Sequence, residues 1–113
     1  MRLKLQPYGL RVPPMAETFS SGVWIVKDGE EDAFVEAWKE FVGWSAGMDG
    51  SGTFRLVRDL GQPGRYLSFA PWESAEASRA WQQHPAFAER LGAVRAHCDD
   101  FQPSSYETAA VVN

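Results

Sequence analysis

Hydrophobic and polar positions alternate in several short segments of the chain and recur at helical spacing between them. The run TFSSGVWIVK, residues 18–27, is rich in aromatic and β-branched residues and predicts a strand that stops at the turn dipeptide Asp28-Gly29. Residues 30–45 then predict a helix, because their apolar positions repeat at intervals of three and four. The predicted inward positions of this helix are Phe34, Val35, Trp38, Phe41, Val42 and Ser45.

Two further strands are predicted on either side of a short Gly/Pro loop. TFRLVRDL, residues 53–60, alternates, is interrupted by Gly61-Gln62-Pro63-Gly64, and is followed by RYLSFAPW, residues 65–72. A short loop of this composition joins neighbouring strands as a hairpin. We therefore expect these two strands to be antiparallel.

The C-terminal third of the chain predicts two helical pieces and a last strand. Ser74 is the expected N-cap of a helix over residues 74–83, which has to end before Pro85. Proline is favoured in the first turn of a helix, so a second piece is predicted over 86–98. A final strand is expected over 105–112, SYETAAVV.

The predicted order is β-α-β-β-α-β, a ferredoxin-like α+β fold with a four-stranded antiparallel sheet and both helices on one face. The other face would then lack a cover. It is too apolar to stay in water, because Val23 and Ile25, Trp24 and Val26, and Leu67 and Phe69 put bulky side chains on both sides of the sheet. A second copy is the simplest cover, and we expect a homodimer whose sheets pack face to face.

Composition and charge restrict the function of the chain. It has 113 residues, room for one hydrophobic core, and a formal net charge of −4, which argues against a nucleic-acid partner. Cys98 is the only cysteine, so no intrachain disulfide is expected and a cytoplasmic location is the default. No segment is apolar enough to predict a membrane span.

Residues 1–17 are expected to be a flexible tail before a domain over 18–113, because the first fourteen residues are basic and end in two prolines.

The spacing of aromatic and acidic residues resembles a known family. Gly29-Glu30-Glu31-x-x-Phe34-x-x-x-Trp38 is followed by Asp59 to Tyr66 and then by Trp72-Glu73-Ser74-x-Glu76-Ala77-x-x-x-x-Trp81-x-x-x-Pro85-x-Phe87. This succession is similar to the antibiotic biosynthesis monooxygenase family of the dimeric α+β barrel superfamily, over about residues 18–112. The stretch from Trp72 to Phe87 is its most specific part, and it mostly encodes packing.

The resemblance implies a homodimer with a pocket in each subunit between the sheet and the helices. Some members of the family oxidise polycyclic hydroxyaromatic compounds to quinones with molecular oxygen and without metal or flavin, while others degrade haem. Fold alone does not choose between these activities.

Several residues become site candidates through the resemblance. Trp72 matches a tryptophan that lines the pocket in quinone-forming members, although it could equally plug the space over the second helix. Ser68 stands where those members carry an asparagine, and it offers a hydroxyl in place of an amide. Arg90 lies near a helix arginine that contacts the reaction intermediate, with a solvated surface arginine as the alternative. Trp81, Tyr66 and Phe87 are predicted to contact an aromatic substrate.

The two histidines are the only side chains whose ordinary pKa suits a proton acceptor near neutral pH. We predict His84 as the base, with capping of the helix break as the alternative, and interpret His97 as a surface residue. Cys98 is expected on the apolar face of its helix. A metal site from His97, Cys98 and Asp100 lacks a second spaced ligand pair and is not favoured.

Haem degradation is also disfavoured by residues of this chain. Haem-degrading relatives carry an iron-ligating histidine ten residues after the tryptophan that corresponds to Trp81, and here that position is Leu91. Without an axial ligand the iron cannot be held in the same manner. We therefore expect no metal and no cofactor.

The sequence thus predicts an oxygen-dependent, cofactor-independent monooxygenase that acts on an aromatic small molecule. Trp72 and Trp81 would form the walls of a dry slot, Ser68 and Arg90 would donate hydrogen bonds, and His84 would accept a proton. Two alternatives stay open. The chain could be a non-catalytic dimeric module of the same fold that binds a small molecule or has a stress-related role. It could also be an isomerase or a relative that acts on small aldehydes, with a smaller and more polar cavity.

Overall fold

The computed structural model describes residues 17–113. Four strands and three helices follow one another in these residues. They are β1 (Thr18–Val26), α1 (Glu31–Ser45), β2 (Arg55–Arg58), β3 (Arg65–Trp72), α2 (Ala75–Gln82), α3 (Phe87–Arg95) and β4 (Cys98–Glu107). The predicted tail, residues 1–17, lies outside the described residues except for Glu17.

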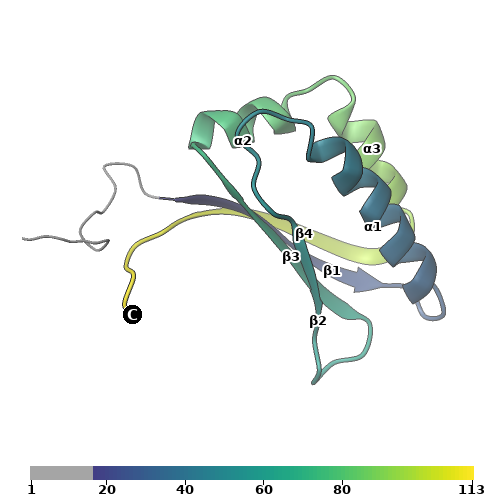
Figure 1. Cartoon of the computed structure of the whole chain (residues 1–113). Helices are drawn as coiled ribbons and strands as arrows, with labels where there is room; N and C mark the ends of the chain where they lie inside the picture. Colours follow the sequence, from purple (N-terminus) through teal and green to yellow (C-terminus); the bar gives the residue numbers. More distant parts are fainter. Residues whose placement is uncertain (1–16) are drawn as a thin grey trace, which may run out of the picture.

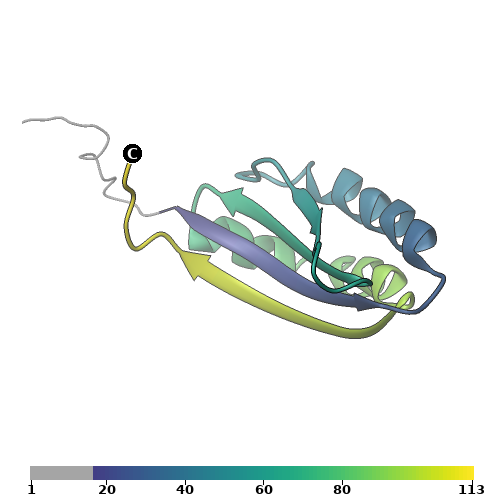
Figure 2. The same cartoon turned by 90° about the horizontal axis from the view of Figure 1, so that it is seen from below.

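The strands form one antiparallel sheet in the order β2-β3-β1-β4. All three helices cover the same face of this sheet (Figure 1). Seen from below, none of the helices in residues 17–113 lies on the opposite face (Figure 2). The predicted ferredoxin-like fold is therefore confirmed, with the second helical segment divided into α2 and α3. No helix in residues 17–113 has the length and apolar character needed to cross a membrane.

Strand β1 runs through the centre of the sheet, and its side chains alternate strictly between the two faces. Its even-numbered residues, from Thr18 to Val26, are buried under the helices, and its odd-numbered residues are only half-buried. A strand places successive side chains on opposite faces, and direct antiparallel partners share a face. The face of each residue in β3 and β4 that has a partner in β1 therefore follows from that partner.

The core lies between the helix-covered face and α1, α2 and α3, and it is unusually aromatic. Its largest buried members are Trp24, Phe34, Phe41, Tyr66, Trp72 and Trp81. Phe34 is fully buried and its ring lies 5.4 Å from that of Trp24 and 5.1 Å from that of Tyr66. Tilted aromatic pairs at such distances add to the stabilisation from apolar burial.

The C-terminal boundaries predicted from the sequence are wrong. Helix α3 ends at Arg95, and β4 spans Cys98–Glu107, so the segment predicted as the end of a helix and a loop is the first half of a strand. Cys98 accordingly begins β4 and does not lie on a helix. The segment contains Asp99, Asp100 and Pro103, which disfavour strands, but among residues 17–113 β4 pairs only with β1 and is an edge strand. Edge strands tolerate charge and proline.

The break between α2 and α3 occurs where Pro85 predicts it. Ser74 caps α2, since its hydroxyl accepts a hydrogen bond from the Ala77 amide at 3.1 Å. After α2, His84 Nδ1 accepts a hydrogen bond from the Ala86 amide at 3.0 Å. The capping alternative considered for His84 therefore describes its geometry.

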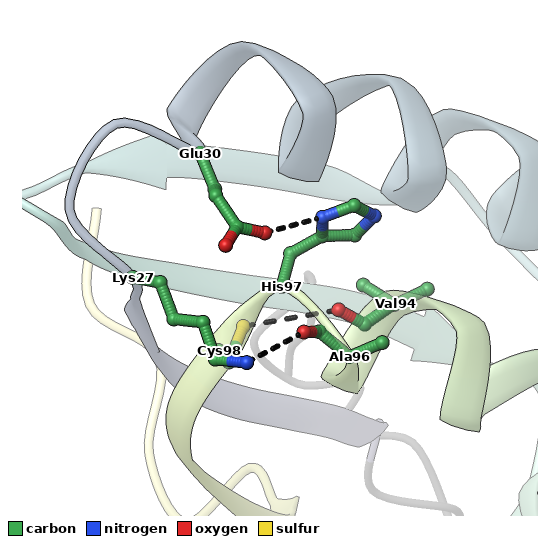
Figure 3. A network of polar contacts seen from close by, with 6 residues as sticks. All are labelled: Lys27, Glu30, Val94, Ala96, His97 and Cys98. Carbon is green, nitrogen blue, oxygen red and sulfur yellow. Dashed lines mark hydrogen bonds and ion pairs between the residues drawn. The ribbon is translucent and has the colours of Figure 1, made fainter.

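A small polar network ties the start of α1 to the turn that leads into β4 (Figure 3). His97 Nδ1 and Glu30 Oε1 lie 2.9 Å apart, and Lys27 Nζ donates to the Ala96 carbonyl at 3.1 Å. The Lys27 amide also donates to the His97 carbonyl at 2.9 Å. His97 is thus a turn residue that contacts another element, in contrast to the surface helix position expected for it.

Candidate ligand-binding cavity

A cavity of about 410 Å³ lies between the helix-covered face of the sheet and the helices. Every element except β2 supplies lining residues, and Phe54 closes the side next to β2. The lining residues are Ser20, Ser21, Gly22, Trp24, Trp38, Phe41, Val42, Phe54, Ser68, Phe69, Trp81, Gln82, Phe87, Leu91, Phe101, Pro103, Ser104 and Ser105. A mainly apolar cavity of this size with a few polar groups is typical of small-molecule sites.

The floor of the cavity is the sheet around Gly22, where hydroxyl groups gather. Gly22 pairs with Ser68 of β3 and with Pro103 of β4, while Ser20 pairs with Ser105. All of these residues lie on the helix-covered face, because Ser20 and Gly22 do. A Cβ at Gly22 would lie 2.6 Å from Cε1 of Phe101, so the glycine is what lets the ring lie over the floor.

Aromatic rings form the walls. Trp24 stacks on Phe101 with ring centroids 4.0 Å apart. Trp81 lies edge-on to Phe87 at 4.9 Å and tilted against Phe41 at 5.9 Å. These rings come from three helices and two strands, so the wall is formed only when the helices dock on the sheet.

Each of three buried tryptophans donates its indole N–H to a serine hydroxyl. Trp24 Nε1 donates to Ser68 Oγ at 2.9 Å, and Trp72 Nε1 donates to Ser20 Oγ at 3.0 Å. Trp81 Nε1 donates to Ser45 Oγ at 2.9 Å, and Ser45 in turn donates to the Phe41 carbonyl. A buried N–H without an acceptor is costly, so these pairs hold the rings in one orientation.

The structure brings three of the predicted site residues to the cavity. Ser68 is on its floor, and Trp81 and Phe87 are in its wall. Trp72 is not a lining residue, but its ring lies 4.9 Å from that of Trp81 and its N–H reaches Ser20 on the floor. The wall role predicted for Trp72 from the resemblance is therefore not seen, and its packing behind Trp81 fits the plug role considered as the alternative.

Tyr66 lies at a second, separate hollow of about 330 Å³ between α1 and the β2–β3 edge. It is buried, and the guanidinium of Arg58, its cross-strand partner, lies 5.7 Å from the ring centroid. A hydrogen bond to Tyr66 is the main cause that raises the pKa of Arg58 above its ordinary value. Trp38 lines both hollows and so forms the partition between them.

His84 and Arg90 lie together around Trp44, which is not a lining residue of the large cavity. The His84 ring is edge-on to Trp44 at 5.1 Å, and the Arg90 guanidinium lies 5.1 Å from the same ring. Both residues are exposed, and neither lines the cavity. The exposed alternative considered for Arg90 fits this placement.

No side chain lining the large cavity in the described part of the chain is ionisable. Cys98 lies outside it, and burial raises the pKa of its thiol to about 11, which keeps it protonated at neutral pH. Across residues 17–113, no group of three or more His, Cys, Asp or Glu side chains is placed to hold a metal ion. The cavity therefore offers hydroxyl and amide hydrogen bonds together with aromatic surface.

Several lining residues, among them Ser20, Trp24 and Phe101, were not singled out as site residues by the sequence. Phe101 was missed because its segment was predicted as a loop before the last strand. The alternation of β1 would have placed Ser20 and Trp24 on one face, but the pairing of β4 was needed to add Phe101.

Fold and cavity together define a ferredoxin-like α+β protein with an aromatic pocket between sheet and helices. The sequence profile of the antibiotic biosynthesis monooxygenase family matches residues 23–90, more than half of the chain. The chain belongs to this family, as the resemblance of its aromatic motifs implied. No curated protein matches it.

Solved structures with the same fold include a cofactor-independent oxygenase. SnoaB, a cofactor-independent oxygenase from Streptomyces nogalater, is 21% identical, with a TM-score of 0.75 over 86% of this chain and 96% of that one. A candidate antibiotic biosynthesis monooxygenase from Deinococcus radiodurans is 18% identical, with a TM-score of 0.74 over 85% of this chain and 96% of that one. A similar candidate from Nitrosomonas europaea is 15% identical, with a TM-score of 0.72 over 95% of this chain and 96% of that one. At these identities the likeness concerns the fold.

Proposed function

We propose that the protein is a cofactor-independent monooxygenase that oxidises a hydroxyaromatic small molecule with molecular oxygen inside the large cavity. The observation that carries the proposal is the cavity itself, about 410 Å³ with aromatic walls and a floor of serine hydroxyls. Membership of the family and the fold shared with SnoaB support it. A flat, electron-rich aromatic compound matches both the walls and the floor.

The proposed reaction needs only the organic substrate and oxygen. With an anthrone as substrate, the ring CH₂ loses two hydrogens and gains one oxygen atom as a carbonyl. The second atom of O₂ leaves as water with those two hydrogens. The electrons come from the aromatic substrate, and the protein contributes a dry site and hydrogen bonds to the substrate oxygen.

In this proposal Trp81 and Phe87 hold the ring of the substrate and Ser68 donates to one of its oxygens. Trp72 acts behind them, through its contacts with Trp81 and Ser20. The sequence-based roles of His84 as a base and Arg90 as a donor stay predictions, and the geometry of residues 17–113 does not support them. Alanine variants at these two positions test them directly.

We also propose that the active form is a homodimer in the cytoplasm. The face of the sheet without helices carries half-buried Phe19, Val23, Ile25 and Leu67, and Tyr106 there is 57% exposed. Packing a second sheet against this face would remove apolar surface from water. Sedimentation velocity at micromolar concentration is expected to give a dimer for the wild type and a monomer for Ile25→Lys, and a monomeric wild type would refute the proposal.

Oxygen uptake by the purified, metal-stripped protein with a panel of anthrones and hydroxynaphthalenes tests the activity. Uptake above the uncatalysed rate is expected for at least one compound, and Trp81→Ala should abolish it by opening the wall. Glu40→Ala, an exposed change on α1, is the matched control and should leave uptake intact. No uptake across the panel would contradict the proposal.

A non-catalytic binding module is the competing function, and the same cavity could serve it. The two differ in what happens after binding. Ligand binding with no consumption of oxygen by any compound that binds would favour the module, and turnover would exclude it.

A further inference from the structure

The large cavity contains only uncharged polar groups. Among its described lining residues, the side chains that can form hydrogen bonds are serines, tryptophans and Gln82, and none of them is ionisable. An ionised ligand entering this space would lose its hydration without gaining an opposite charge. Burying an unpaired charge is far more costly than burying a neutral group that finds a hydrogen bond.

Charged side chains on the surrounding elements face other partners. On α3, the Arg90 guanidinium lies over Trp44 and that of Arg95 lies 5.5 Å from the ring of Phe101. Lys39 of α1 and Arg58 of β2 line the second hollow, and Lys39 also pairs with Glu36. Asp99 and Asp100 of β4 are exposed. None of these groups lines the large cavity.

Two serines on the cavity floor accept hydrogen bonds from tryptophan side chains. The oxygens of Ser20 and Ser68 each accept an indole N–H, from Trp72 at 3.0 Å and from Trp24 at 2.9 Å. A hydroxyl has one proton to donate, and an oxygen that already accepts a bond turns this proton elsewhere. In residues 17–113 neither hydroxyl has an acceptor within hydrogen-bonding geometry. Both residues line the cavity.

We infer that Ser20 and Ser68 are paired hydrogen-bond donors that select the uncharged form of an aromatic hydroxy or keto ligand. Trp72 and Trp24 are positioning residues that direct these donors into the cavity. The two serines lie on neighbouring strands as diagonal neighbours, since Gly22 pairs with Ser68 and Ser20 pairs with Ala70. Their hydroxyls can therefore donate to two oxygens on one edge of a flat ligand, or both can donate to a single oxygen. The inference rests on the proposed use of this cavity and specifies its ligand class.

The first test compares three probes of similar shape by titration calorimetry: 1-naphthol, naphthalene and naphthalene-1-sulfonate. The pH is kept where 1-naphthol is uncharged. We expect 1-naphthol to bind at least tenfold more tightly than the sulfonate and more tightly than naphthalene. Binding of the sulfonate as tight as that of 1-naphthol, or no binding of 1-naphthol, would overturn the inference.

The second test uses variants of the donors. Ser68→Ala and Ser20→Ala should each weaken 1-naphthol binding about two- to tenfold, as expected for one lost hydrogen bond, and leave naphthalene binding unchanged. Equal losses for both ligands would mean that the serines only shape the cavity. This outcome would overturn the donor role.

The third test asks whether Trp72 acts through Ser20. Trp72→Phe removes the N–H but keeps an aromatic ring, and it should weaken 1-naphthol binding as much as Ser20→Ala does. The double variant should lose no more than either single variant, because both remove the same directed donor. The double variant also lacks the indole N–H, so no buried donor is left without an acceptor. It therefore stays folded even where Ser20→Ala alone unfolds. Additive losses would refute the positioning role.

These results test the inference about the ligand class independently of the proposed reaction. Selection of uncharged 1-naphthol without oxygen uptake from any compound would support the donor pair and contradict the monooxygenase proposal. Oxygen uptake with equal binding of neutral and anionic probes would do the reverse.

Discussion

Ser45, the last residue of α1, offers a sharp test of how the cavity wall is held. It is fully buried, and its hydroxyl accepts the Trp81 indole N–H at 2.9 Å while donating to the Phe41 carbonyl at 2.9 Å. Ser45→Ala would leave the N–H of Trp81, which is 7% exposed, without an acceptor among the described residues. We expect this change to destabilise the fold.

The magnitude follows from the groups involved. An orphaned buried donor costs about 1–3 kcal/mol. Alanine has the higher helix propensity, which offsets about 0.5 kcal/mol. Serine is small, so little cavity forms. The expected net loss is about 1–2 kcal/mol, or a decrease of roughly 4–15 °C in Tm for a domain of this size.

Urea unfolding, followed by tryptophan fluorescence at one fixed protein concentration, measures this loss. Glu40→Ala, exposed on the same helix, is the control and should stay within about 0.5 kcal/mol of the wild type. In a Trp81→Phe background no donor is left to orphan, so Ser45→Ala should then cost little. An equal cost in both backgrounds would refute the reasoning, because the loss would not depend on the indole.

Three other outcomes are expected. Gly22→Ala should lower the free energy of unfolding by about 1–3 kcal/mol, because its Cβ would lie 2.6 Å from Phe101; unchanged urea unfolding would contradict this. Since the pKa of Cys98 is raised from 9.0 to about 11, its alkylation at pH 8 should be about a hundredfold slower in the native protein than in urea and should accelerate up to pH 11. Comparable rates in both states would exclude the shift. The Gly61 amide and Arg65 lower the pKa of Asp59, so its contribution to stability is present above the ordinary pKa and is lost as the pH falls through the native value. NMR titration should give a midpoint that rises toward the ordinary value in Arg65→Ala, and an unchanged midpoint would exclude the Arg65 contribution.

Local patterns were sufficient for most of the elements. The alternation in β1, the helical spacing of Phe34 and Phe41, and the Gly/Pro loop before β3 each reflect a constraint that acts within a few residues. Ser74 as a cap and Pro85 as a break act over the same short range. These features predicted the order of strands and helices and the inward positions of the first helix.

The position of β4 could not be read locally. Asp99, Asp100 and Pro103 disfavour a strand, and only pairing with one side of β1 makes this segment extended. The same pairing brings Phe101 onto Trp24 and Ser105 beside Ser20. Half of the cavity floor therefore depended on a strand that the pattern misplaced.

The candidate site divides in the same way. The sequence by itself determined the aromatic character of the interior and identified Ser68, Trp81 and Phe87, because residue type and family spacing are visible in one dimension. Which tryptophan lines the cavity, and which serine each indole contacts, depended on side chains 36 to 52 residues apart in the chain. Only the packing of helices on the sheet brings such distant groups within hydrogen-bonding distance, so tertiary structure decided that the cavity has hydroxyl donors and no ionisable lining residue in the described part of the chain.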